Sequence, residues 1–186
     1  MKITLGIPSN RGVKLKTVES LLNLVSFSKE IDFHIVGAGE GYTTAENRNY
    51  LAVQALKNGS DYLLFVDDDM IFPADTLDKL LKTGKQIVGV LSYSRKLPLQ
   101  ATVWKPEDIK EALFECEQVG GGVLLIDTKV FNEMERPWFA FETYDSGMIK
   151  VGEDAYFCQK AKTRGISVWC EPSISIGHIG NYVYGK

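Results

Sequence analysis

Apolar and polar positions follow a regular rhythm through the first half of the chain. Short apolar runs alternate with longer segments in which apolar residues recur every three or four positions. The short runs predict strands at residues 3–8, 32–36, 62–66 and 87–93. The longer segments predict helices at residues 14–28, 43–58 and 73–83. Strand and helix in alternation predict a mostly parallel sheet covered on both faces, a three-layer α/β/α sandwich.

The second half is less regular. A polar, basic loop with two prolines occupies residues 94–111. The apolar run 123–126 predicts another strand of the same sheet, and residues 128–134 a short helix. An aromatic, irregular stretch then leads to a predicted helix at 154–164 and a last strand at 166–170. With no internal repeat and no low-complexity segment, residues 1–186 are expected to form one domain.

Composition narrows the class of protein. The chain has 21 basic and 24 acidic residues, a net charge of −3, which gives no reason to expect nucleic acid or an anionic membrane as a partner. No apolar run approaches the roughly 20 residues of a membrane span, and the N-terminus lacks the pattern of a signal peptide. The three cysteines have no C-x-x-C spacing. They are expected to be reduced thiols of a soluble, cytoplasmic protein.

Three consecutive aspartates follow the predicted strand 62–66. In an extended chain, Asp67 and Asp69 point to one side and Asp68 to the other. Carboxylates this close repel one another, and a divalent cation such as Mg²⁺ or Mn²⁺ would cancel the repulsion. Two alternatives are a solvated acidic turn and the D-x-D motif of haloacid-dehalogenase-type phosphatases. The phosphatase motif continues with threonine, where this chain has Ile71.

Four other features carry candidate chemistry, each with a simpler alternative. Arg48, near a helix N-terminus, could bind an anion or form an ordinary surface pair. The glycines at 120–122 permit either a bulge or the close approach of a ligand. Asp154 is either an N-cap or a general base. His178, in the sequence GHIG, is either a loop residue or a ligand for Mn²⁺.

Taken in order, these segments resemble the GT-A glycosyltransferases, most closely the family-2-like enzymes and their small viral or phage relatives. The matching segments are IPSNR (7–11), ENRNYLAVQAL (46–56), YLLFVDDDM (62–70), GGG (120–122), GEDAYFCQKAKTRG (152–165) and GHIG (177–180). The resemblance implies the GT-A fold, with a nucleotide-binding half at 1–93 and a half at 94–186 that completes the metal and acceptor sites. The chain is short for such enzymes, which leaves open that it is one domain of a longer protein.

The resemblance also implies a hexosyltransferase reaction and a role for each motif residue. The donor would be a nucleotide-diphosphate sugar, foremost a UDP- or GDP-sugar, and the acceptor a glycan or another hydroxyl compound. Donor contacts would come from Pro8, Asn10, Arg11, Arg48, Asp67, Asp68, Arg95, Lys96, Gly121, Gly122 and Glu153. Mn²⁺ or Mg²⁺ would be held by Asp67, Asp69 and His178, and Asp154 would be the catalytic base of an inverting transfer. The alternative is a non-catalytic module that binds nucleotide sugars or glycans on the same fold.

Overall fold

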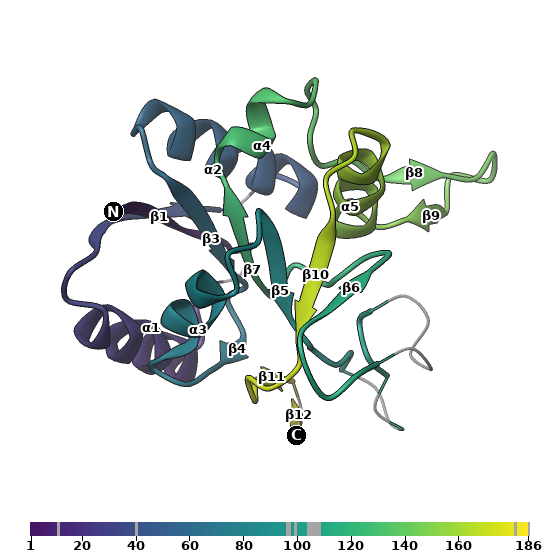
Figure 1. The fold of residues 1–186 in the computed structure, drawn as a ribbon. Helices are drawn as coiled ribbons and strands as arrows, with labels where there is room; N and C mark the ends of the chain where they lie inside the picture. Colours follow the sequence, from purple (N-terminus) through teal and green to yellow (C-terminus); the bar gives the residue numbers. More distant parts are fainter. Residues whose placement is uncertain are drawn as a thin grey trace.

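The computed structural model describes residues 1–10, 12–39, 41–95, 98, 100–103, 109–180 and 182–185. Within these residues a seven-stranded sheet forms the centre of the molecule (Figure 1). Its order is β2 (Asp32–Ala38), β1 (Lys2–Pro8), β3 (Tyr62–Val66), β7 (Val123–Asp127), β5 (Ile87–Val90), β10 (Val168–Glu171), β6 (Phe114–Cys116). Strands β2, β1, β3, β5 and β10 run in one direction, whereas β7 and β6 run in the other. The predicted α/β class with a mostly parallel sheet is confirmed.

Strand β7 departs from the simple parallel expectation. It was predicted within the sheet, and it lies near its centre, antiparallel to both β3 and β5. Its residues Val123–Ile126 are fully buried. An apolar run covered on both faces has the same sequence pattern in either direction, so the pattern alone does not give the direction of the strand.

Helices cover both faces of the sheet. The helices α2 (Thr44–Lys57), α4 (Lys129–Asn132) and α5 (Glu153–Thr163) share one hydrophobic core with Leu63 and Phe65 of β3. The helices α1 (Leu15–Phe27) and α3 (Thr76–Lys82) share a second core with Leu64 and Val66. Alternate side chains of one strand thus enter opposite layers, as the period of an extended chain requires. The result is the predicted three-layer sandwich (Figure 1).

The helix boundaries follow local chemistry. Thr43 caps α2 with the predicted capping box, because its Oγ1 accepts the Glu46 amide at 3.3 Å and Glu46 Oε2 accepts the Thr43 amide at 2.7 Å. Helix α3 begins at Thr76 rather than at Pro73, and the Thr76 amide donates to the Pro73 carbonyl at 3.2 Å. None of the described helices is long and apolar enough to span a membrane.

Two small sheets stand beside the central one. One is a hairpin of β8 (Glu142–Thr143) and β9 (Ile149–Val151), which projects beside α5 (Figure 1). The other joins β4 (Met70–Ile71), β11 (Gly177–Ile179) and β12 (Val183–Gly185). In the second sheet His178 pairs with Met70. This pairing brings the C-terminal segment next to the aspartates that precede β4.

The three cysteines are free and buried. Burial raises the pKa of both Cys116 and Cys158 to about 12. These thiols are therefore packing residues with little thiolate character, in accord with the expectation from their spacing.

Candidate functional site

A polar cavity of about 440 Å³ lies at the carboxyl ends of β1 and β3. This is the edge where ligands bind in open α/β sheets. The cavity collects most of the residues singled out in the sequence. Those that line it are Pro8, Asn10, Arg48, Asp67, Asp68, Asp69, Arg95, Glu153, Asp154 and His178. Arg11 and Lys96 lie outside the described residues.

The three aspartates occupy a turn, not an extension of the strand. Strand β3 ends at Val66, and the Met70 amide donates to the Asp67 carbonyl at 3.4 Å. The predicted alternation therefore fails here, because it holds only while the chain is extended. Asp68 does not point away from the cavity: it lines the wall, and its Oδ2 accepts the Ser9 hydroxyl at 2.6 Å.

Asp69 and His178 form the pair best placed to hold a cation. Asp69 is buried, and its Oδ1 lies 3.2 Å from His178 Nε2. His178 Nδ1 lies 2.9 Å from the Tyr93 carbonyl, a bond that leaves Nε2 as the nitrogen directed at Asp69. Burial disfavours the charged imidazole, but the bonds to Asp69 and to the Tyr93 carbonyl outweigh it and raise the pKa of His178.

The spacing of this pair fits a divalent cation. Adjacent ligands of an octahedral ion at ~2.1 Å are about 3.0 Å apart, close to the observed separation. Carboxylate oxygen with imidazole nitrogen is also a donor set suited to Mn²⁺. Within the described part of the chain, no three His, Cys, Asp or Glu side chains form a ready-made metal cluster. The remaining positions would thus fall to water and ligand oxygens, as is usual for Mg²⁺.

Two arginines form ion pairs with Asp69 and Asp67. Arg95 Nη1 donates to Asp69 Oδ2 at 2.7 Å, and the Arg95 side chain is half exposed. Arg48 Nη2 donates to Asp67 Oδ1 at 2.8 Å, so this carboxylate is paired with a guanidinium. Burial raises the pKa of Asp67 to about 6, although Arg48 acts to lower it.

Asp154 also lines the cavity, from the first turn of α5. The N-cap of α5 is Gly152, which excludes the reading of Asp154 as an N-cap. Asp154 Oδ2 accepts the Gly121 amide at 3.2 Å, and Oδ1 accepts the Ala155 amide at 2.7 Å. A carboxylate that accepts hydrogen bonds from two backbone amides keeps a fixed orientation.

Gly121 and Gly122 do not line the cavity but support its wall. Gly122 accepts the Asp67 amide at 2.9 Å through its carbonyl, and Gly121 contacts both Arg48 and Asp154. The glycine segment thus packs behind the charged residues that line the cavity.

Sequence reasoning missed three cavity residues, Gly12, Lys14 and Thr44. Lys14 is the N-cap residue of α1, and its amide donates to the Asp68 carbonyl at 2.8 Å. The position of Lys14 in the sequence could have indicated that it lines the cavity. Lys14 belongs to the loop after β1, and such loops lie at the carboxyl edge of the sheet.

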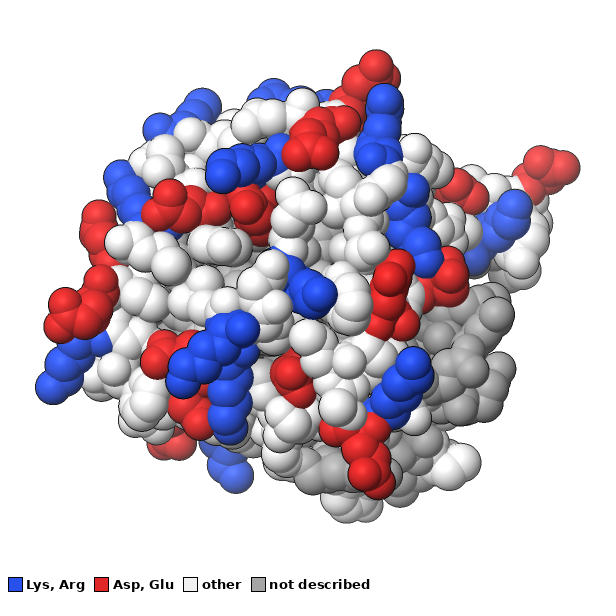
Figure 2. All heavy atoms as spheres, in the orientation of Figure 1, with Lys and Arg blue, Asp and Glu red and all other residues white. Residues whose placement is uncertain are grey.

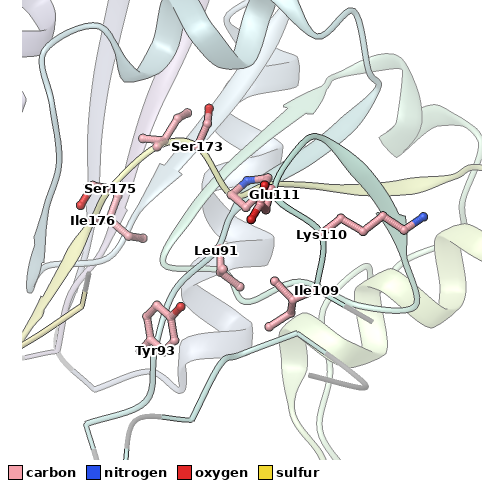
Figure 3. Close-up of a pocket in the computed structure, with 10 residues that line it drawn as sticks. Leu91, Tyr93, Ile109, Lys110, Glu111, Ser173, Ser175 and Ile176 are labelled. Carbon is pink, nitrogen blue, oxygen red and sulfur yellow. The ribbon is translucent and has the colours of Figure 1, made fainter. Parts of the chain in front are cut away.

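A second cavity, of about 380 Å³, lies at the carboxyl ends of β5 and β10 (Figure 3). Its wall is more apolar, with Leu91, Tyr93, Ile109 and Ile176 among the residues around it. None of the predicted site residues lines it. On the molecular surface, acidic and basic side chains are interspersed over the visible face (Figure 2).

Comparison with solved structures identifies the fold. A197 from STIV superposes with a TM-score of 0.68 at 20% identity, over 97% of this chain and 86% of A197. Residues 1–349 of S. aureus TarS, in complex with UDP-GlcNAc, give 0.55 at 13% identity, over 92% of this chain. The chain has the GT-A fold. The superposition covers 56% of the TarS fragment, so this chain spans little more than half of the length of that fragment.

A further similar structure is the nucleoside-diphosphate-sugar pyrophosphorylase from Vibrio cholerae RC9. It superposes with a TM-score of 0.51 at 13% identity, over 91% of this chain and 72% of the pyrophosphorylase. No protein-family model matches the sequence, and no curated protein matches it significantly. At such identities the likeness concerns the GT-A fold alone.

Proposed function

We propose that the protein is a metal-dependent glycosyltransferase that moves a sugar from a nucleotide-diphosphate donor to an acceptor hydroxyl, with inversion. One observation carries the proposal: a single cavity at the carboxyl edge of a GT-A fold is lined by Asp67, Asp69, His178 and Asp154. Two of the similar proteins, TarS in complex with UDP-GlcNAc and the nucleoside-diphosphate-sugar pyrophosphorylase, support nucleotide sugars as the donor class.

Asp69 and His178 would hold Mn²⁺ or Mg²⁺, because a carboxylate oxygen and an imidazole nitrogen lie side by side on the cavity wall. A bound cation supplies Lewis-acid stabilisation of the diphosphate that leaves. Arg95 and Lys14 lie on the cavity wall and carry the positive charges that would face the phosphate oxygens. Pro8 and Asn10, at the end of β1, would lie beside the nucleoside.

Asp154 would act as the base. The acceptor hydroxyl gives its proton to the Asp154 carboxylate, and its oxygen forms the new bond to the anomeric carbon. The bond from that carbon to the diphosphate breaks, and the diphosphate leaves with the electron pair. Attack on the face opposite the leaving group inverts the anomeric centre. The hydrogen bonds from the Gly121 and Ala155 amides fix the orientation of the Asp154 carboxylate, which this step needs.

The donor class is tested by thermal shift with UDP-, GDP-, CDP- and dTDP-sugars, with and without Mn²⁺. A ligand at about 100 times its Kd stabilises a protein by roughly 2.7 kcal/mol. For a chain of this size that corresponds to a Tm increase of roughly 5 to 11 °C. Stabilisation by one nucleotide sugar, dependent on Mn²⁺, is expected. A lack of response to all four would contradict the proposal.

Catalysis is separated from binding by Asp154→Asn. The variant keeps the shape of the side chain but cannot accept the proton. We expect at least a 100-fold loss of turnover, because general base catalysis contributes roughly 10² to 10⁴ in rate. Nucleotide affinity should stay within about threefold of the parent, since Asp154 is not among the proposed donor contacts. A wild-type protein that binds the donor but neither transfers nor hydrolyses it would be the binding module instead.

A further inference from the structure

Arg48 is almost completely buried, which is unusual for a residue expected to contact a ligand. Its side chain is 2% exposed, although it belongs to the first half of α2 at the cavity wall. A buried guanidinium is tolerated only when carboxylates pair with it. Two of its nitrogens are paired: Nη2 with Asp67 at 2.8 Å and Nε with Glu153 at 3.3 Å.

These two carboxylates line the same cavity but come from segments far apart in the chain. Asp67 follows β3 on the side of the Asp69–His178 pair, whereas Glu153 is the first residue of α5 and precedes the proposed base. Only a forked donor reaches both, because the planar guanidinium presents several N–H groups at fixed angles. A lysine has one nitrogen on a flexible stem and would not span the pair in the same way.

Gly121 explains how the guanidinium fits. A Cβ at this position would lie 2.5 Å from Arg48 Nη2 and 2.6 Å from Cζ, closer than real Cβ contacts. The Arg48 guanidinium also lies over the Phe65 ring, with Cζ 5.1 Å from the ring centre. The same Gly121 donates its amide to Asp154. Arg48 therefore contacts the backbone that holds the proposed base, as well as the residue beside that base.

We propose that Arg48 is a positioning residue: seated on Gly121, it ties Asp67 to the first turn of α5 and so sets the place of Asp154 relative to the donor site. Its effect on transfer rests on the proposed function, whereas its effect on the first turn of α5 does not. The middle glycine of the triple-glycine segment is then required by the guanidinium, and not only by the approach of a ligand.

The first test measures structure without any ligand. Hydrogen–deuterium exchange of the amides at 152–156 is compared among wild type, Arg48→Lys, Gly121→Ala and the matched control Gly122→Ala. A Cβ at Gly122 meets only the flexible Met70 side chain, 3.2 Å away at the sulfur. We expect exchange at 152–156 to rise at least fivefold in Arg48→Lys and Gly121→Ala, and to change less than twofold in the control. Unchanged exchange in both test variants would overturn the proposal.

A mutant cycle distinguishes a specific contact between Gly121 and Arg48 from general misfolding of the variants. Arg48→Met combined with Glu153→Gln and Asp67→Asn removes the buried ion pairs from both sides, which proteins often tolerate better than the loss of one partner. In this background Gly121→Ala should lower Tm less than it does in wild type, because the guanidinium it displaces is gone. Equal Tm losses in both backgrounds would show that Gly121 serves some other neighbour and would count against the proposal.

The functional test uses UDP-GlcNAc with Mn²⁺ as the probe, followed as UDP release. A positioning role predicts that Arg48→Lys lowers kcat at least tenfold while the Kd for UDP changes less than threefold. A Kd that weakens in step with kcat would mean that Arg48 binds the nucleotide directly, which overturns the proposal. If the wild-type protein neither binds nor turns over the probe, the proposed function or this donor is at fault, and the exchange measurement still decides the role of Arg48.

Discussion

At the scale of single residues, Asp69 links the aspartate turn after β3 to the C-terminal segment. Its two carboxylate oxygens face different partners, His178 at 3.2 Å and Arg95 at 2.7 Å. Arg95 compensates the charge of a buried carboxylate that would otherwise be costly to enclose. Because the Arg95 side chain is half exposed, we propose that it turns toward a donor phosphate when a cation takes its place at Asp69.

This arrangement predicts how single substitutions change metal binding. Asp69→Asn removes the charged ligand and His178→Ala removes the nitrogen ligand, so each should weaken Mn²⁺ binding at least tenfold. The measurement is the free Mn²⁺ signal in electron paramagnetic resonance titrations, with UDP present. Asp68→Asn is the matched control: its carboxylate accepts from Ser9 and stands outside the Asp69–His178 pair, so a change below threefold is expected. Equal losses in all three variants would point to a general charge effect and not to a metal site.

Most of the candidate site could be predicted from the sequence, because its acidic residues stand at or near the predicted ends of strands and helices. Asp67, Asp69, Asp154 and His178 were all named from their local context, and the structure brings them to one cavity. The predicted orientation of Asp68 was wrong, because the chain forms a turn after Val66 and the strand does not continue. The burial of Arg48 could not be predicted from the sequence, because it depends on contacts with Gly121 and Glu153, which are distant in the chain.

At the scale of elements, prediction succeeded where local signals are strong. The bounds of α2 follow from its capping box and from the glycine after it, and β3 matches its apolar run. The short strands β4, β11 and β12 were not predicted. Each has only two or three residues, too few for a period to appear, and their pairing depends on contacts between distant segments.

The capping box of α2 makes a pH-dependent contribution to stability. Bonds from the Thr43 amide and hydroxyl lower the pKa of Glu46 below its usual 4.5. A lowered folded-state pKa means that the stabilisation is complete above the unfolded-state pKa and is lost as pH falls through the folded-state value. Glu46→Gln keeps an acceptor in the box but removes the charge. It should lower the urea midpoint at pH 7, and the difference from wild type should shrink at pH 3.

Comparison of the two midpoints at each pH cancels the titration of all other groups. Glu19→Gln on α1 provides a matched surface control, for which no such convergence is expected. A Glu46→Gln difference that persists unchanged at pH 3 would show that the charge of Glu46 does not contribute through the cap.

At the scale of the whole molecule, the two halves expected from the resemblance are interleaved. Strand β7 of the second half lies between β3 and β5 of the first, and β11 pairs with β4. The cavity accordingly draws Asp67 and Asp69 from one half and Asp154 and His178 from the other. The geometry of the cavity therefore depends on strands of both halves being in place.

The β8–β9 hairpin gives a prediction about the acceptor. It projects beside α5 (Figure 1) and leads directly into Gly152 and the proposed base. Tyr144 and Met148 in its turn and Ile149 in β9 are exposed. Exposed apolar side chains contribute little to folding, and this hairpin leads into the first turn of α5, so we propose that an acceptor sugar packs on the Tyr144 ring. Tyr144→Ala with Met148→Ser should leave Tm within about 2 °C of the parent, since surface changes typically stay within roughly 0.5 kcal/mol.

The same variant should leave donor hydrolysis intact but lower transfer to the acceptor about tenfold, equivalent to roughly 1.4 kcal/mol of transition-state binding. Both rates are read from one assay, as released nucleotide with and without the acceptor, so damage to the donor site would appear in both. Lys150→Ala, at the base of the hairpin, serves as the control for a general effect of charge or loop motion. If hydrolysis and transfer fall together, the hairpin supports the donor site, and the acceptor must approach Asp154 from another side.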